Sequence, residues 1–331
     1  MVLSRPETSM LPKPTKTSSP PLRTGTVALI GRPNVGKSTL LNALLGERIA
    51  ITSHHPQTTR DRILGVIHRA DAQIALVDTP GLHAAKNKLG ARMNAEAKDV
   101  AEGADVVVCV VDVGREPRPD VDPRDAAVFR QLPENATVVL VVNKTDRVRP
   151  KELLLPALEA YGAARDFAAI IPMSAKTKDG VERLLEVLVG LLPEGDALYE
   201  ADTLTDRPVR FFAAELVREA VLQKTREEVP HGVACVVETF AEPTGKKKMT
   251  EISVAIHVAK DTHKKIVVGR AGSLIKEIGT SARARIEELL GGPVLLKTHV
   301  RVTPEWFDRD DRLRELGYGA TTDRNLEPSK R

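Results

Sequence analysis

The stretch "GRPNVGKST", residues 31–39, decides the fold class, because it places a glycine-bracketed turn between the apolar run "TVALI" and the helix-like "LLNALLG". Backbone N–H groups freed by Gly31 and Gly36 can curl around a polyphosphate, and the helix that follows presents its positive N-terminus. Lys37 can reach the terminal phosphates, and the Ser38 hydroxyl can ligate Mg²⁺. The strand before the turn and the helix after it predict a P-loop that holds a nucleoside triphosphate.

Length and composition predict two ordinary domains. The chain has 331 residues, 42% of them hydrophobic, which is enough for two cores. Cys109 and Cys235 lie inside apolar runs, which excludes a disulfide framework and suits the reducing cytoplasm. No apolar stretch approaches the roughly 18 to 20 residues of a membrane span. Residues 1–24 hold five prolines and no apolar core for a secretory signal, so we expect a disordered tail there.

The charge is unevenly divided along the chain. The whole chain carries +4, but residues 207–303 contain 17 Lys and Arg against 11 Asp and Glu, a net charge of +6. Such asymmetry is ordinary for a solvated surface, and it also fits a module that meets a phosphate backbone.

From about Gly25 to Pro193, apolar runs alternate with helix-like segments. The expected strands are "TVALI", "AQIALVDT", "ADVVVCVVDV", "ATVVLVVNK" and "FAAIIPMSA". Runs that are apolar on both faces predict an α/β fold, a mostly parallel sheet with helices on both faces. Ligands of such sheets bind at the carboxyl ends of the strands. The expected boundaries are a G domain at 25–195, a linker at 196–208, a smaller α+β domain at 209–305 and a C-terminal tail with one short helix at 306–331.

Three further motifs each follow one of these strands. In "DTPG" (78–81), Asp78 can hold Mg²⁺ through water and the Gly81 N–H can contact a γ-phosphate. In "NKTD" (143–146), Asp146 can accept two hydrogen bonds from guanine, which disfavours ATP.

"SAK" (174–176) would let the Ala175 N–H touch the guanine O6. Each motif is weak alone, but four in order, each at a strand end, predict a GTP site. Its expected residues are Gly31, Arg32, Pro33, Asn34, Val35, Gly36, Lys37, Ser38, Thr39, Asp78, Thr79, Pro80, Gly81, Asn143, Lys144, Asp146, Ser174, Ala175 and Lys176.

The polar loop "SHHPQTTRDRILG" (53–65) lies between the P-loop and "DTPG". A switch loop needs a Thr that closes on Mg²⁺ when the γ-phosphate is bound. We predict Thr59 for this role, with Thr58 as the alternative, so the expected metal ligands are Ser38, Thr59 and Asp78. The expected catalytic residues are Lys37, Thr59, Gly81 and Asn34. We interpret His54 and His55 as solvated loop residues.

The second domain reads α-β-β-α-α-β and contains "IVVGRAGSLIKEIG" (266–279). A G-x-x-G turn between two helices allows close approach of a sugar-phosphate chain, and apolar neighbours can flank a groove for about four unpaired bases. The pattern is that of a KH domain of the bacterial type, and the aromatic content of 3% argues against recognition by aromatic stacking. The expected RNA-binding residues are Ile266, Val267, Gly269, Arg270, Ala271, Gly272, Ile275 and Lys276.

Together, "GRPNVGKST", "QTTRDR", "DTPGLH", "NKTD", "SAK", the KH module and the closing "W...LRELGY" resemble the Era GTPases of bacteria, within the TrmE-Era class. The resemblance runs from about Gly25 to Tyr318. It implies a type II KH domain, GTP/GDP and Mg²⁺ as ligands, and binding near the 3′ end of small-subunit (16S) ribosomal RNA. It further implies assistance to 30S biogenesis, a link to the cell cycle or energy status, and a cytoplasmic monomer with peripheral contact to the inner membrane.

Position 82 departs from Ras-like enzymes, which place a water-orienting Gln directly after D-x-x-G. Here that residue is Leu82, and the neighbouring His83 is interpreted as a cap of the loop. Related GTPases with Asn at the position of Asn34 hold a potassium ion there, so K⁺ is an expected ligand of this chain.

Two other function classes stay open on the sequence alone. One is a non-hydrolysing RNA-binding scaffold with GTP as a structural ligand. The other is a GTPase whose basic domain meets a protein or an anionic membrane instead of RNA.

Overall fold

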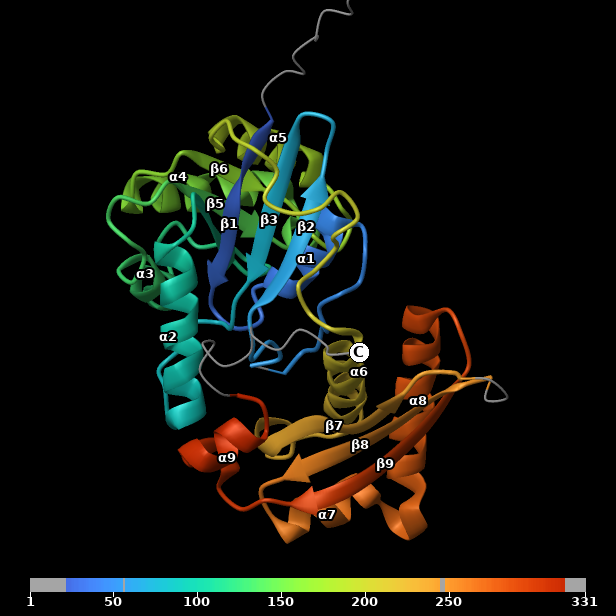
Figure 1. The fold of residues 1–331 in the computed structure, drawn as a ribbon. Coiled ribbons are helices and arrows are strands. Elements are labelled where there is room, and N and C mark those ends of the chain that lie inside the picture. The colour runs from blue at the N-terminus through green and yellow to red at the C-terminus, as the bar shows by residue number, and fades with distance from the viewer. Residues whose placement is uncertain (1–21, 56, 245–247, 319–331) are drawn as a thin grey trace, which may run out of the picture.

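The structure, a computed structural model, describes residues 22–55, 57–244 and 248–318. Figure 1 shows two domains, with the first in the upper part of the view and the second, which begins with helix α6 (Val209–Lys224), below it. The elements of the first domain are β1 (Arg23–Gly31), α1 (Lys37–Leu45), β2 (Ile63–His68), β3 (Ala72–Asp78), α2 (Lys88–Glu102), β4 (Val106–Asp112), α3 (Pro123–Phe129), β5 (Val138–Asn143), α4 (Leu154–Ala164), β6 (Ala169–Pro172) and α5 (Val181–Leu191).

The first domain is built on a six-stranded sheet in the order β2-β3-β1-β4-β5-β6. Every neighbouring pair is parallel except β2 and β3, which are antiparallel. The predicted mostly parallel sheet is thereby confirmed. The expected strands do not include β2, whose first residues fall in the predicted polar loop 53–65.

Both faces of this sheet are covered by helices. Along β1, Val27 and Leu29 pack with the residues of α1 and α5, whereas Ala28 and Ile30 pack with those of α2, α3 and α4. All four side chains are fully buried. Burial of such a side chain contributes about 1.5 to 3 kcal/mol, so the central strands form a rigid support for the loops at their carboxyl ends.

The second domain follows the predicted order α-β-β-α-α-β. Its elements are α6 (Val209–Lys224), β7 (Val233–Ala241), β8 (Thr250–Val258), α7 (Asp261–Val268), α8 (Ser273–Leu290) and β9 (Val294–Val302). The sheet order is β7-β8-β9, with β7 antiparallel and β9 parallel to β8. A core of aliphatic side chains joins the sheet to α6, α7 and α8.

Two of the expected domain ends differ from the structure. Strand β1 begins at Arg23, so Arg23 and Thr24 are strand residues and not tail; residues 1–21 lie outside the described residues. The segment expected as a C-terminal tail is folded from Trp306 to Tyr318; its expected short helix is present as α9 (Asp310–Glu315), after a 3₁₀ turn at Trp306–Asp308.

Trp306 is fully buried, and with Tyr318 it packs against Leu89 and Met93 of α2 and Ala234 of β7. Figure 1 shows α9 below the lower end of α2. We call these residues the joint, because they come from both domains. The expected linker 196–208 is also held, since Gln73 Oε1 accepts hydrogen bonds from two of its backbone N–H groups. In the described part of the chain, no helix is long and apolar enough to cross a bilayer.

Candidate functional site

The turn between β1 and α1 has the backbone of a P-loop. Gly31, Asn34 and Gly36 have φ of 153°, 65° and 104°, values that L side chains rarely adopt. A Cβ on Gly31 would lie 2.4 Å from the Val110 carbonyl oxygen, and a Cβ on Gly36 would lie 2.4 Å from Asn143 Nδ2. The turn therefore needs glycine at both positions, as the sequence pattern predicts.

Lys37 is the first residue of α1, and its ammonium group lies inside the turn. Its Nζ donates to the carbonyl oxygens of Gly31 and Arg32, both at 3.1 Å. Only 6% of Lys37 is exposed, and burial lowers its pKa, against the opposing effect of the Asp78 carboxylate. A cation in such a low-dielectric position interacts strongly with a phosphate group that enters the turn.

Three oxygen-bearing side chains meet beside Lys37. Ser38 Oγ donates to Asp78 Oδ2 at 2.7 Å and lies 2.7 Å from Thr59 Oγ1, and Thr59 Oγ1 donates to Asp78 Oδ2 at 3.3 Å. Among the described residues, Asp78 Oδ1 is buried without a hydrogen-bond partner. Burial raises the pKa of Asp78. A buried, unpaired carboxylate oxygen next to two hydroxyls fits a divalent cation, because hard cations prefer oxygen ligands.

The structure also separates Thr59 from Thr58. The Thr58 hydroxyl donates to the His55 carbonyl oxygen and contacts Ser53 Oγ, both at 2.7 Å, so it closes its own loop. Thr59 instead faces Ser38 and Asp78. The geometry thus favours Thr59 over Thr58 as the switch threonine.

The residues expected to read guanine lie at the ends of β5 and β6. Asn143 Oδ1 accepts from the Ala175 N–H at 2.9 Å, and Asn143 Nδ2 donates to the Val35 carbonyl at 2.9 Å, which joins this region to the P-loop. Ser174 Oγ donates to Asp146 Oδ1 at 2.7 Å and fixes that carboxylate. A carboxylate held in this way can accept the two N–H groups of guanine and rejects adenine.

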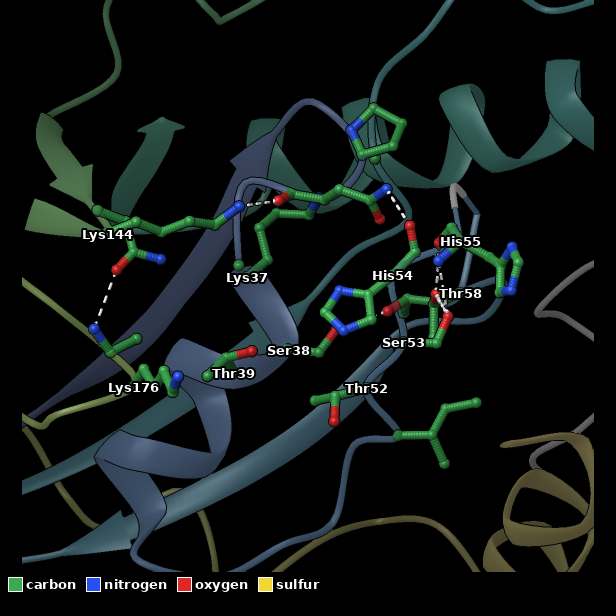
Figure 2. A pocket seen from close by; sticks show the side chains of 18 of the residues that line it. Lys37, Ser38, Thr39, Thr52, Ser53, His54, His55, Thr58, Lys144 and Lys176 are labelled. Carbon is green, nitrogen blue, oxygen red and sulfur yellow. Dashed lines mark hydrogen bonds between the residues drawn. The ribbon is translucent and has the colours of Figure 1, made fainter. Parts of the chain in front are cut away.

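A cavity of about 840 Å³ connects these groups. Figure 2 shows Lys37, Ser38 and Thr39 on one side of it and the loop from Thr52 to Thr58 on another. The predicted residues that line it are Pro33, Asn34, Gly36, Lys37, Ser38, Thr39, Thr59, Gly81, Asn143, Lys144, Asp146, Ala175 and Lys176.

Of the expected site residues, those that do not line the cavity are Gly31, Arg32, Val35, Asp78, Thr79, Pro80 and Ser174. Two of these, Arg32 and Thr79, support the wall with side chains that point elsewhere. The Arg32 guanidinium bonds to Asp125 of α3, and the Thr79 hydroxyl donates to the Leu29 carbonyl at 2.8 Å. Other lining residues were not among the expected nucleotide-site residues: Ile51, Thr52, Ser53, His54, His55, Gln57, Thr58 and Arg147. Leu222 and Gln223 of α6 also line the cavity and were not predicted. No local motif could have found them, because they reach the cavity only through the packing of the second domain.

The loop after β3 lies against the front of the P-loop. A Cβ on Gly81 would be 2.5 Å from Pro33 N, and the Leu82 N–H donates to the Gly31 carbonyl at 3.1 Å. Leu82 is buried in the sheet core, so it offers nothing to a water molecule. The loop can therefore sense a γ-phosphate through the backbone of Gly81 alone.

His83 caps this loop, as the sequence predicts, and also joins it to the switch loop. Its Nδ1 lies 2.8 Å from the Gly81 carbonyl oxygen, and its Nε2 lies 2.8 Å from Gln57 Nε2. Because a carbonyl only accepts, Nδ1 carries the proton and Nε2 accepts from the Gln57 amide.

The switch loop also makes a direct contact with the second domain. Arg60 donates to the carbonyl oxygens of Val233, Pro230 and His231 at 2.6 to 3.1 Å, and its guanidinium lies over the Trp306 ring at 5.5 Å. Arg218 of α6 donates to the Thr58 carbonyl. The loop that carries Thr59 is thus bonded on both sides of that residue to the second domain.

The G-x-x-G turn lies between α7 and α8. Gly269, Ala271 and Gly272 have φ of 73°, 49° and 78°, and Arg270 and Ala271 are exposed. A Cβ on Gly269 would lie 2.7 Å from Leu274 Cβ, so this glycine is required. Such an exposed turn leaves backbone N–H groups accessible to a phosphate chain.

The flanks of this turn divide between surface and core. Ile266 is 49% exposed, Lys276 is exposed and Ile275 is half-buried, so all three can meet a ligand. Val267 is fully buried in the core under α7. Its expected place in the RNA groove is wrong, because the helical turn points its side chain toward the sheet.

Comparison with known proteins finds relatives of both domains. The family model described as a 50S ribosome-binding GTPase matches residues 26–144, and that of the KH domain matches residues 228–307. "GTPase Era" of Geobacter sp. (strain M21) is 44% identical over 298 residues, covering 89% of this chain and 98% of its own. "GTPase Era" of Xanthomonas oryzae pv. oryzae (strain MAFF 311018) is 44% identical over 303 residues, covering 91% and 99%.

Two solved structures are similar over nearly the same span. Era in complex with MgGDPNP and nucleotides 1506–1542 of 16S ribosomal RNA has a TM-score of 0.86, is 37% identical, and covers 90% of this chain and 99% of its own. A variant of Aquifex aeolicus Era with one substitution, bound to GDP.AlF4-, has a TM-score of 0.85 at 37% identity, with 90% and 100% covered.

Fold and site define the class of protein: a P-loop GTPase domain followed by a KH domain. Two relatives are 44% identical to this chain over 89% and 91% of its length, which identifies the family within this class. The chain belongs to the Era family of GTPases.

Proposed function

We propose that this GTPase hydrolyses GTP to GDP and phosphate with Mg²⁺, binds small-subunit ribosomal RNA near its 3′ end, and assists maturation of the 30S subunit. The observation that carries the hydrolytic part is the contact of Asp78 with Ser38 and Thr59, two residues that line the same cavity as Asp146. A phosphate-cleaving centre and a guanine-reading carboxylate thereby share one pocket.

Each residue of the cavity has a distinct task in this mechanism. Asp146 selects guanine, and Lys37 stabilises the charge of the β- and γ-phosphates. The Gly81 N–H can donate to the γ-phosphate, and Thr59 closes the switch loop over it. Ser38, Thr59 and Asp78 would hold Mg²⁺, which when bound neutralises charge that builds up on the phosphate oxygens.

The RNA part of the proposal is supported by the exposed G-x-x-G turn and by the basic second half of the chain. Arg270 lies in that turn, exposed, and residues 207–303 carry a net charge of +6. One similar solved structure is described as Era with nucleotides 1506–1542 of 16S ribosomal RNA. The same module on this chain is expected to bind the equivalent region.

We further propose a cytoplasmic monomer that associates peripherally with the inner face of the cell membrane. Support comes from the charge of the second domain, because basic surfaces attract anionic headgroups. Flotation of the full chain with vesicles that contain anionic lipid, compared with neutral vesicles, tests the membrane part.

The central test measures two activities of the full chain. We expect GTP turnover that requires Mg²⁺, and a gel shift with RNA of the 16S 3′ end that weakens steeply with salt. RNA binding without any turnover would support a non-hydrolysing scaffold instead. Turnover with no preference for this RNA over a scrambled sequence would move the partner of the basic domain to a protein or membrane.

A further inference from the structure

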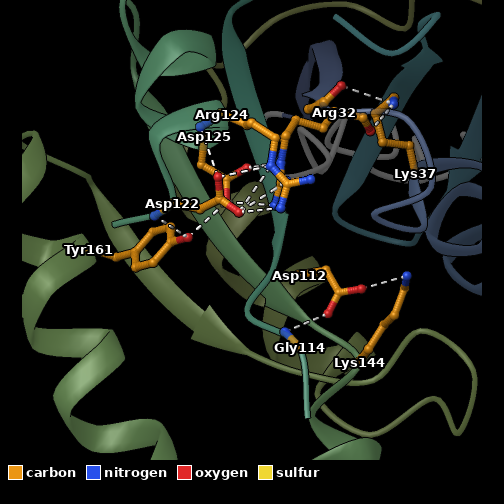
Figure 3. Close-up of polar contacts among 10 residues, drawn as sticks. Arg32, Lys37, Asp112, Gly114, Asp122, Arg124, Asp125, Lys144 and Tyr161 are labelled. Atoms are coloured by element: carbon orange, nitrogen blue, oxygen red, sulfur yellow. Dashed lines mark hydrogen bonds and ion pairs between the residues drawn. The ribbon is translucent and has the colours of Figure 1, made fainter. Parts of the chain in front are cut away.

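Two groups of charged side chains, each with carboxylates that lie outside the GTPase motifs, hold the front of the P-loop, residues 31–34. Figure 3 shows both groups, one on the side of α3 and one at the end of β4. Among the described residues that line the cavity, neither group's carboxylates appear. They therefore act on the nucleotide site only through other residues.

The first group, the α3 anchor, joins Arg32 to the start of α3. Arg32 Nε and NH2 donate to the two oxygens of Asp125 at 2.5 and 2.9 Å, and NH1 donates to Asp122 at 3.3 Å. Asp125 is only 1% exposed and also accepts from the Tyr161 hydroxyl at 2.7 Å. A bidentate pair of this kind fixes the orientation of the guanidinium as well as its position.

The second group, the β4 anchor, joins Lys144 to the last residue of β4. Lys144 Nζ lies 2.7 Å from Asp112 Oδ2 and donates to the Asn34 carbonyl oxygen at 2.5 Å. The other Asp112 oxygen accepts from the Gly114 N–H at 3.0 Å. Asp112 thus sets the direction from which Lys144 holds Asn34.

The two anchors hold the half of the P-loop that faces Gly81, the residue expected to sense the γ-phosphate. Pro33 is in close contact with Gly81, and the Gly31 carbonyl accepts from the Leu82 N–H. The rear of the loop has separate support, from Asn143 to the Val35 carbonyl and from α1. A shift of the front half would change the spacing to Gly81 and leave the rear half in place.

Stability alone does not explain why the chain places buried charges here. A buried ion pair is often no more stabilising than apolar side chains of similar volume, and its best-attested use is to specify geometry. The geometry specified here is that of Arg32 and Asn34, on either side of Pro33. Asn34 has a positive φ that the surrounding structure must maintain.

We propose that Asp125 and Asp112 are positioning residues for GTP hydrolysis, Asp125 through Arg32 and Asp112 through Lys144. The inference rests on the proposed hydrolysis of GTP. Loss of either carboxylate frees the front of the P-loop, so the spacing to Gly81 is lost while GDP stays bound by the rear of the loop and the guanine site.

The test compares kcat at saturating GTP, KM, and the Kd of fluorescent GDP for the full chain and its variants. We expect Asp125→Asn to lower kcat about tenfold, since small misplacements of reacting groups carry effects of this size or larger. Its Kd for GDP should stay within about threefold of the wild type. Asp112→Asn should show the same split between kcat and Kd, with a smaller loss, because Asp112 is partly exposed.

Matched variants separate positioning from stability. Arg124 is 75% exposed at its side chain and pairs with Asp122, and Arg124→Ala should leave kcat unchanged. Tyr161→Phe removes a hydrogen bond to Asp125 but keeps the Arg32 pair, so it should lower the unfolding temperature without the loss in kcat. Arg32→Lys keeps the positive charge but loses the paired hydrogen bonds to Asp125, so it should lower kcat as Asp125→Asn does. The kcat of the double variant, Arg32→Lys with Asp125→Asn, should be no lower than that of either single variant.

The outcomes distinguish this inference from the proposed function. A wild type without turnover overturns both. A wild type with turnover, but with kcat unchanged in Asp112→Asn and Arg32→Lys, overturns the inference alone, and these two variants decide the matter if Asp125→Asn fails to fold. Equal losses in kcat and in GDP affinity would also overturn it, because they would show general collapse of the loop.

Discussion

The P-loop and the G-x-x-G turn are both glycine turns that face phosphate, but different contacts hold them in place. Both place glycine at positive φ just before a helix, α1 in the first domain and α8 in the second. The P-loop is held by side chains from β4, β5 and α3. In the part of the chain that the structure describes, the G-x-x-G turn is held by its own backbone, with Gly269 bonded to the Lys265 carbonyl and Gly272 to the Gly269 carbonyl.

The difference corresponds to the work that each turn does. A site that cleaves phosphate needs its charges fixed and desolvated before the substrate arrives. A turn that holds an RNA backbone needs access and reach, because phosphate contacts position the ligand without reading it. Lys37 is a buried cation, as a site that cleaves phosphate requires, whereas Arg270 is exposed and accessible to an RNA backbone. Substitutions in the two turns should therefore have separable effects, and effects in the P-loop should be larger.

The largest effect is expected for Lys37→Ala. It removes a buried cation from the β- and γ-phosphates, and turnover should fall by about a thousandfold, as for the loss of a preorganised donor. Nucleotide titration and a phosphate-release assay measure this. RNA binding, assayed by gel shift, should be retained; unchanged GTP affinity and turnover would refute the P-loop assignment.

The second turn is tested by Arg270→Asp combined with Ala271→Asp. Asp tolerates the positive φ of Ala271 better than most residues, so the fold should persist. Two carboxylates facing the phosphate chain should weaken RNA binding by at least about a hundredfold through like-charge repulsion. A gel shift with RNA of the 16S 3′ end measures this, with GTP turnover as the control. If the shift persists, the groove lies elsewhere.

Asp146→Asn should change the identity of the nucleotide. The Ser174 hydroxyl still has an oxygen to bond, but the amide no longer accepts both guanine N–H groups. GTP affinity should fall about 10- to 100-fold, the value of hydrogen bonds to a charged group, and xanthosine triphosphate should bind instead. Competition between the two nucleotides is the measurement, and a variant that still prefers GTP contradicts the role of Asp146.

The smallest effect concerns the potassium ion that we expect beside Asn34. The Asn34 amide nitrogen donates to the His54 carbonyl at 2.8 Å, so the amide oxygen is the atom that would bind K⁺. We expect turnover about tenfold faster in potassium than in sodium at equal ionic strength, because the ion neutralises developing charge.

Asn34→Ala should erase that difference while GTP remains bound. Asn34→Gly is the matched control, since it removes the same oxygen without strain at φ 65°. Equal rates of the wild-type chain in both salts would point to RNA or the ribosomal particle as the source of the missing catalytic group.

The sequence predicts the features that depend on local pattern. The apolar runs give the five parallel strands, and the motifs at their ends give the phosphate and guanine walls of the cavity, although not the wall formed by the loop from Ile51 to Thr58. The prediction succeeds because parallel strands bring their carboxyl ends to one edge. Strand β2 was not predicted, because its first residues fall in the polar loop 53–65 and because the strand lies antiparallel at the edge of the sheet.

The features that sequence reasoning missed depend on contacts between distant segments. Leu222 and Gln223 reach the cavity because α6 packs beside the switch loop. The sequence pattern of α6 does not predict this contact. Arg60 reads as a polar loop residue, although it is nearly fully buried against the second domain. Val267 looked like the flank of a groove, because its apolar character is the same whether a residue lines a groove or a core.

The joint has a consequence for the order in which the chain can assemble. Its aromatic side chains, Trp306 and Tyr318, follow both domain cores in the sequence, and they pack on Leu89 and Met93 of α2. Domains generally fold as units, from the N-terminus onward, while a chain is being synthesised. We therefore expect the two cores to form before Trp306 and Tyr318 are added, so that the segment after β9 completes a contact between the domains that Arg60 and Arg218 also make.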